Sequence, residues 1–157
     1  MQLFRLARRP FTQGPGGAFG GDGAYLAGSR WNTPGRRMSF AAQSESLAIL
    51  EYLVHATSDA FFDDVLLIVA ELDDRYIASV DVEKLPKDWR SFPPAAGTQR
   101  IGDDWLASGA TAAMLVPSAI VPRERNVLAN PQHRDYSKLK IVSTEAWGAD
   151  PRLEQLR

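Results

Sequence analysis

The chain has 157 residues, of which 45% are hydrophobic and 24% charged, with a net charge of −1 at pH 7. This composition is typical of a folded globular protein and excludes a disordered chain of low hydrophobicity and high charge. The lack of a basic excess argues against a nucleic-acid-binding protein, which gains affinity from phosphate contacts. Because the sequence has no cysteine, disulfides, iron–sulfur clusters and thiolate zinc sites are excluded as well.

The location and the metal content follow from what the sequence lacks. Its longest apolar runs, residues 65–70 and 112–116, are too short to span a bilayer, and the N-terminus has no charged-then-apolar signal pattern. We therefore expect a cytoplasmic protein that does not bind membranes. Two histidines, His55 and His133, are too few for a metal site without carboxylates, so no metal is expected.

The N-terminal third predicts a strand, a glycine-rich loop and a helix. Residues 2–8 alternate polar and apolar side chains, which is typical of a strand with one buried face. Residues 10–23 are rich in glycine and form a loop, either a mobile cover for a site or a plain surface loop. Leu47, Leu50 and Val54 recur at helical spacing within 44–55, which predicts a helix with Ser44 as its N-cap.

The remainder of the chain predicts several strands and one further helix. Strands are expected over 64–72, 76–82, 112–117, 126–129 and 139–147, and a helix over 98–108 that ends at Gly109. Prolines make 86–94 an ordered connection. The sum is about six strands and two or three helices, so the sequence predicts a single α+β domain over 1–157 with mostly antiparallel sheets.

Two groups of polar residues in the first third can carry chemistry. Arg30 lies between glycine-rich turns, where its guanidinium can bind a phosphate or carboxylate, or can be a surface arginine beside a core Trp31. Ser44, Glu51 and His55 lie on one face of the predicted helix. That face can hold an acid–base or charge-stabilising pair, or can be an ordinary solvated surface.

A third group follows the predicted strand at 112–117. This segment contains prolines and four polar residues whose side chains can fix turns or offer hydrogen bonds to a ligand: Ser118, Asn126, Asn130 and His133. Ser118 lacks the G-x-S-x-G context of a nucleophilic serine. The sequence also lacks a P-loop and a G-x-G-x-x-G fingerprint, which excludes a Rossmann-type dinucleotide site.

The order of these segments resembles one family, the RES domain, which is named for its arginine, glutamate and serine. The resemblance extends over nearly the whole chain. Its motifs are, in order, FRLAR, GSRWNTPG, MSFAAQS, LAILEYLVH, LPKDWR, TQRIGDDWLASG, VPSAIVP, NVLANPQH and DPRL. On this basis Arg30, Glu51 and Ser118 match the three residues that give the family its name.

The resemblance implies a fold similar to ADP-ribosyltransferases of the diphtheria-toxin type. It also implies the toxin of a bacterial type II toxin–antitoxin system that cleaves the nicotinamide–ribose bond of NAD by hydrolysis or phosphorolysis. Transfer of ADP-ribose to a cellular protein is an alternative, and a non-catalytic binding module is a second one. The implied partner is an antitoxin, often with a helix-turn-helix domain, that blocks the site; a second copy of the chain is left open.

The resemblance also assigns roles to residues. Glu51 would bind the ribose and stabilise positive charge, and Arg30 would hold a phosphate of NAD. Phe40 stands where the family usually has a tyrosine, which keeps a ring for stacking but removes a hydroxyl. The other predicted NAD contacts come from Ser44, His55, Ser118 and Asn130, with His55 also able to orient Glu51.

Overall fold

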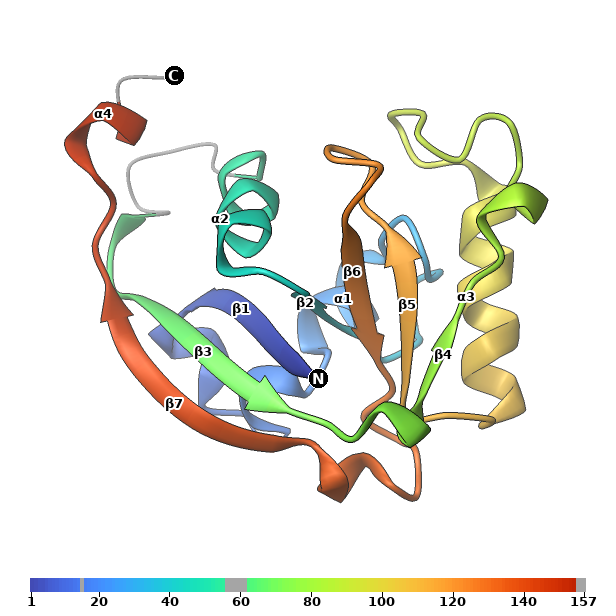
Figure 1. The fold of residues 1–157 in the computed structure, drawn as a ribbon, viewed down its shortest axis with the longest axis horizontal. Helices are drawn as coiled ribbons and strands as arrows, with labels where there is room; N and C mark the ends of the chain where they lie inside the picture. The colour runs from blue at the N-terminus through green and yellow to red at the C-terminus, as the bar shows by residue number, and fades with distance from the viewer. Residues whose placement is uncertain (15, 56–61, 155–157) are drawn as a thin grey trace.

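Seven strands form one sheet in the computed structural model, which describes residues 1–14, 16–55 and 62–154. The order across the sheet is β4-β5-β6-β2-β1-β3-β7, and β4 with β5 is the parallel pair (Figure 1). The mixed, mostly antiparallel sheet confirms the predicted α+β class. The strands are β1 Gln2–Arg8, β2 Ser39–Ala42, β3 Val65–Glu71, β4 Ile77–Ser79, β5 Ala113–Pro117, β6 Arg125–Ala129 and β7 Lys140–Trp147.

Two of the helices pack against different strands of the sheet. α2 packs on β1 and β2, and α3 lies beside β4 at the opposite end of the sheet (Figure 1). The α-helices are α1 Asp22–Ala27, α2 Glu45–Leu53, α3 Ala96–Ser108 and α4 Pro151–Glu154. Short 3-10 turns connect them, namely η1 Arg9–Thr12, η2 Gly17–Phe19, η4 Asp74–Tyr76, η5 Val82–Lys84 and η6 Tyr136–Lys138.

Two elements differ from the sequence-based expectation. β2 lies in the middle of the sheet between β1 and β6, although no strand was predicted over its residues. It is four residues long, which is too short for an alternating pattern to stand out. α1 begins at Asp22, within the segment expected to be a loop.

The glycine-rich segment is packed against the sheet where the structure describes it. Phe19 is 1% exposed and lies in the same core cluster as Leu3 and Ala7 of β1. The backbones of Gly16 and Gly20 are so close that a Cβ on Gly16 would lie 2.4 Å from the Cα of Gly20. The glycines here serve close packing, as only glycine allows such an approach.

A close contact between α3 and the segment after α1 holds Arg30 in place. A Cβ at Gly102 would lie 1.8 Å from the carbonyl oxygen of Trp31. Two hydrogen bonds fasten the same segment: Gln99 Nε2 donates to Ser29 O at 2.9 Å, and Thr33 Oγ1 donates to the Asp103 carboxylate at 2.7 Å. α3 therefore positions residues 29–33 by direct contact.

Gly102→Ala is expected to lower the free energy of unfolding by about 3 kcal/mol, the upper end of the usual cost of overpacking. The reason is that a rigid backbone carbonyl, and not a flexible side chain, occupies the space of the new methyl group. Urea unfolding followed by circular dichroism measures the change. Gly23→Ala in α1 is the matched control, because its Cβ would meet nothing within 4 Å; equal stability of both variants would contradict the close contact.

Candidate active site

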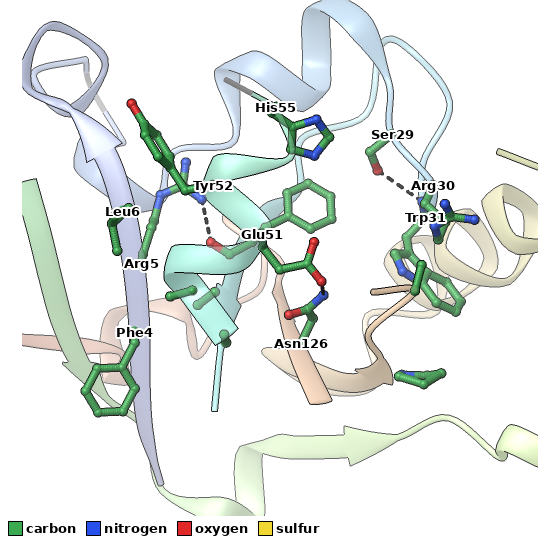
Figure 2. A pocket seen from close by; sticks show the side chains of 16 residues that line it. Phe4, Arg5, Leu6, Ser29, Arg30, Trp31, Glu51, Tyr52, His55 and Asn126 are labelled. Atoms are coloured by element: carbon green, nitrogen blue, oxygen red, sulfur yellow. Dashed lines mark hydrogen bonds between the residues drawn. The ribbon is translucent and has the colours of Figure 1, made fainter. Parts of the chain in front are cut away.

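A cavity of about 330 Å³ opens between β1, β2, α2 and the segment at 29–31. Four residues predicted from the sequence line it: Arg30, Phe40, Glu51 and His55. Figure 2 shows Glu51 and His55 on one side of the cavity and Arg30 on the other. The structure thus brings the segment that carries Arg30 and the helix α2 together at one site. Asn126, which the sequence offered as a turn-forming or ligand-binding residue, lines the cavity too, and so do Arg5, Ser29 and Tyr52, which the sequence did not single out.

Glu51 is held by two hydrogen bonds from residues on or next to the strands β5 and β6. Ser118 Oγ donates to its Oε1 at 2.7 Å, and Asn126 Nδ2 donates to the same oxygen at 2.5 Å. Ser118 follows β5, and Asn126 lies in β6. Since α2 is capped by Ser44, whose Oγ accepts from Leu47 N at 3.2 Å, the helix that carries Glu51 is fixed at its start too. Glu51 is therefore an oriented carboxylate at the wall of the cavity.

Arg30 is anchored by backbone carbonyls of the proline-rich connection. Its NH1 donates to Trp89 O at 2.6 Å and to Ser91 O at 2.9 Å. Partial burial lowers the pKa of Arg30, the Glu51 carboxylate opposes this shift, and the nearby Arg90 adds to it. The guanidinium remains a cation at neutral pH, and it faces the cavity while it ties the 86–94 connection to the site.

Arg5 is a second cation at the cavity, on β1. It donates a hydrogen bond from NH1 to the carbonyl oxygen of Phe40, and its guanidinium lies 5.8 Å from the centroid of the Phe19 ring. Burial lowers its pKa to about 10, with Tyr136 partly opposing the shift. Among the described residues no carboxylate lies within ion-pair distance of Arg5, and its Nε is buried without a hydrogen-bond partner. A partly buried cation that no described carboxylate pairs with, at a cavity, is suited to an anionic ligand.

Ser118 lies behind the cavity wall. It is completely buried, and it reaches the site through its hydrogen bond to Glu51. His55 is exposed and lines the cavity one turn beyond Glu51. No hydrogen bond joins the His55 side chain to Glu51 in the part of the chain that the structure describes.

Ser44 and Asn130 lie outside the residues that line the cavity. The Ser44 hydroxyl caps α2 and donates to Glu124 Oε2 at 3.0 Å. Asn130 is buried after the end of β6, where its Oδ1 accepts from Gln132 N at 3.0 Å. Four residues separate Asn130 from Asn126, which along a strand is about 13 Å. Ser44 caps its helix and Asn130 fixes a turn, as the capping and turn-forming interpretations of the sequence allowed.

The glycine-rich segment does not contribute to the cavity in its described part. The lining residues come from β1, β2, α2, residues 29–31, and the ends of β5 and β6. Tyr136 Oη donates to Gly16 O at 3.4 Å, which fastens the segment away from the cavity.

Comparison with known proteins identifies the family. The model of the RES domain matches residues 2–151. This chain belongs to the RES domain family. It is 38% identical over 154 residues to a protein named Toxin Res from Photorhabdus laumondii, covering 98% of this chain and 97% of that protein.

Other relatives of this RES domain extend the comparison. A Sphingobium protein named Prs ADP-ribosylating toxin is 38% identical over 136 residues, covering 85% of this chain and 84% of the relative. A chain of the M. tuberculosis MbcT–MbcA toxin–antitoxin complex superposes with a TM-score of 0.76 at 18% identity, covering 99% of this chain and 88% of that one. This likeness supports the fold that the resemblance implied.

The described residues of this RES domain contain neither a cluster of metal ligands nor a membrane-spanning helix. No group of three or more histidine or acidic side chains there can hold a metal ion. No helix among them is long and apolar enough to cross a membrane.

Proposed function

We propose that this RES domain protein is the toxin of a bacterial type II toxin–antitoxin system and cleaves the nicotinamide–ribose bond of NAD by hydrolysis or phosphorolysis. The observation that carries the proposal is the convergence of one oriented carboxylate, Glu51, and two cations, Arg5 and Arg30, on a single cavity. The relatives named Toxin Res support the toxin role, and the one named Prs ADP-ribosylating toxin supports the use of NAD.

The chemistry needs little from the protein beyond charge and orientation. Nicotinamide is bound to the ribose as a cation, so it leaves as a neutral molecule with the electron pair of the C–N bond and needs no general acid. The ribose carbon becomes oxocarbenium-like, and a carboxylate near it stabilises the developing positive charge. Glu51 is the residue for this role, and water or phosphate then forms the new bond to the same carbon.

The two arginines have the complementary role. NAD carries a diphosphate, and guanidinium groups bind phosphate oxygens with charge-assisted hydrogen bonds. Arg5 has no carboxylate partner among the described residues, and Arg30 uses its NH1 for two carbonyls. We assign the phosphate contact to both, with the larger share for Arg5. The Phe40 ring packs against nicotinamide, and His55 contacts the substrate at the cavity rim.

The proposal includes the setting in which the toxin works. A cell cannot tolerate uncontrolled loss of NAD, so the chain needs a cognate antitoxin, for which a helix-turn-helix protein that covers the cavity is the expectation. The likeness to a chain of a toxin–antitoxin complex is consistent with such a partner. We place both proteins in the cytoplasm, where NAD is available.

Transfer of ADP-ribose to a cellular protein is the second candidate. It is favoured by the 38% identity to the Sphingobium protein named Prs ADP-ribosylating toxin. The same Glu51 and arginines serve both reactions, because the bond that breaks is the same. The difference lies in the nucleophile, which in this case is a side chain of the acceptor protein.

A nicotinamide-release assay tests the proposal. Purified protein incubated with NAD and phosphate is expected to release nicotinamide, measured by liquid chromatography. Free ADP-ribose marks hydrolysis, its 1″-phosphate marks phosphorolysis, and label from [³²P]NAD on a protein band in lysate marks transfer. Absence of nicotinamide release in both buffer and lysate would favour a non-catalytic binding module instead.

A further inference from the structure

The two hydrogen bonds to Glu51 meet on one carboxylate oxygen. Ser118 Oγ lies 2.7 Å and Asn126 Nδ2 lies 2.5 Å from Oε1. No hydrogen bond from the described residues reaches Oε2. Because Glu51 lines the cavity, Oε2 is the oxygen that remains for a substrate. The carboxylate is thus clamped on one side and free on the other.

The Ser118 hydroxyl can give its proton only to Glu51 in this arrangement. Its Oγ accepts hydrogen bonds from the backbone N–H groups of Ile120 at 3.1 Å and Val121 at 3.0 Å. A serine hydroxyl has one proton to donate and two lone pairs with which to accept. Both lone pairs are occupied, so the proton points at Oε1, and the fully buried side chain has no freedom to turn away.

Asn126 is held equally firmly, on the cavity side. Its backbone lies in β6, paired with Ala42 of β2 on one side and Val116 of β5 on the other. Its Oδ1 is buried without a hydrogen-bond partner in the described part of the chain. Rotating the amide so that Oδ1 and Nδ2 exchange places would put Oδ1 against Oε1 of Glu51. The two oxygens would repel each other because both carry negative partial charge. Figure 2 shows Asn126 aimed directly at the Glu51 carboxylate.

We infer that Asn126 is a positioning residue that, with Ser118, clamps Oε1 of Glu51 so that Oε2 faces the reacting ribose carbon. This inference rests on the proposed function for its kinetic consequence, and on the geometry alone for the contact. Asn126 acts through Glu51 and replaces His55 in the orienting role, because His55 makes no hydrogen bond to Glu51 among the described residues.

The kinetic test uses a variant of nearly the same shape. Asn126→Leu keeps nearly the same volume and removes the Nδ2 donor without adding a charge beside Glu51, and Asn126→Ala removes the whole amide. Both are expected to lower kcat for nicotinamide release about ten- to hundredfold, the equivalent of one hydrogen bond to a charged group, with KM changed by less than about threefold. Wild-type kcat in Asn126→Leu would overturn the inference.

Thr111→Ala is the matched control for loss of stability. Thr111 also makes two hydrogen bonds, accepting from Trp105 Nε1 at 3.0 Å and donating to Ala113 O at 2.8 Å, but at the end of β5 away from the cavity. It is expected to unfold at lower denaturant concentration with kcat unchanged. If Thr111→Ala lowered kcat as much as Asn126→Ala, the effect at Asn126 would be one of stability, and the inference would fail.

A double-mutant cycle tests the contact without any activity. Unfolding is measured for Asn126→Ala, Glu51→Ala and the double variant, and the destabilisation by the pair is expected to be smaller than the sum of the single effects. Additive effects would overturn the inference whether or not the protein consumes NAD. Coupling between the two in a protein that releases no nicotinamide would instead leave the positioning contact standing and reject the proposed function.

Discussion

Replacing Glu51 with glutamine is expected to lower kcat for nicotinamide release about a hundredfold to a thousandfold, the usual effect of losing one preorganised electrostatic contact. The fold should be unaffected. The amide oxygen of glutamine can accept the hydrogen bonds from Ser118 and Asn126 that Oε1 accepts now. The substitution therefore removes the negative charge that faces the ribose while the local contacts remain.

Glu45→Gln is the matched control for this experiment. Glu45 lies on the same helix and is exposed in its first turn, so the net charge changes by the same amount away from the cavity. We expect wild-type kcat for this variant, with a slight loss of stability from a weaker interaction with the helix dipole. Equal turnover by wild type and Glu51→Gln, measured by nicotinamide release, would remove Glu51 from the reaction.

The predicted helices and strands are confirmed where an element has a periodic or apolar pattern within its own sequence. The alternation in residues 2–8 and the apolar run at 64–72 correspond to β1 and β3, and the leucine spacing corresponds to α2. The prediction omits β2, which lies between two strands and is defined by its pairing with them. A strand of four residues is too short to show a periodicity of its own.

In the candidate site, too, the residues predicted from the sequence are those with a local pattern or a motif. Helical spacing was enough to place Glu51 and His55 on one side. Arg30 and Ser118 were candidates from their local sequence, and the family resemblance favoured their functional interpretation. Arg5 was missed because, inside an alternating strand, an arginine is expected on the solvent face. Asn126 was interpreted as a residue that fixes a turn or binds a ligand, and its contact with Glu51 was not predicted, since only the pairing of β6 with β2 brings its amide to that carboxylate. Contacts across the sheet are not encoded in local spacing.

Arg5→Met is expected to raise KM for NAD about ten- to hundredfold while kcat changes little, because a charge-assisted contact to phosphate is lost and Glu51 is untouched. The free energy of unfolding should be equal to wild type within about 1 kcal/mol, or higher. Burial lowers the pKa of Arg5 to about 10, so at neutral pH the folded protein carries a desolvated cation without a carboxylate partner among the described residues. Methionine removes that cost, which offsets the lost hydrogen bond to Phe40 O.

The stability effect of Arg5 has a definite pH dependence. Burial lowers its pKa to about 10 in the folded protein, well below its ordinary value in the unfolded chain, so above about pH 10 the unfolded state binds more protons. The stability of the wild type relative to Arg5→Met therefore rises with pH above about 10 and is constant below it. Urea unfolding of both proteins at pH 7 and pH 10.5 measures this difference, and a difference that fell with pH would contradict the burial of the charge.

Arg30→Met distinguishes the role of Arg30 from that of Arg5. Its NH1 binds Trp89 O and Ser91 O, so its loss leaves two carbonyls of the 86–94 connection without this donor. We expect lower stability as well as a higher KM, in contrast to Arg5→Met, which should affect KM alone. Isothermal titration with NAD on the inactive Glu51→Gln background measures the affinity without turnover. If Arg5→Met on this background bound NAD as tightly as Glu51→Gln alone, the phosphate contact would be assigned to Arg30, as the family resemblance first implied.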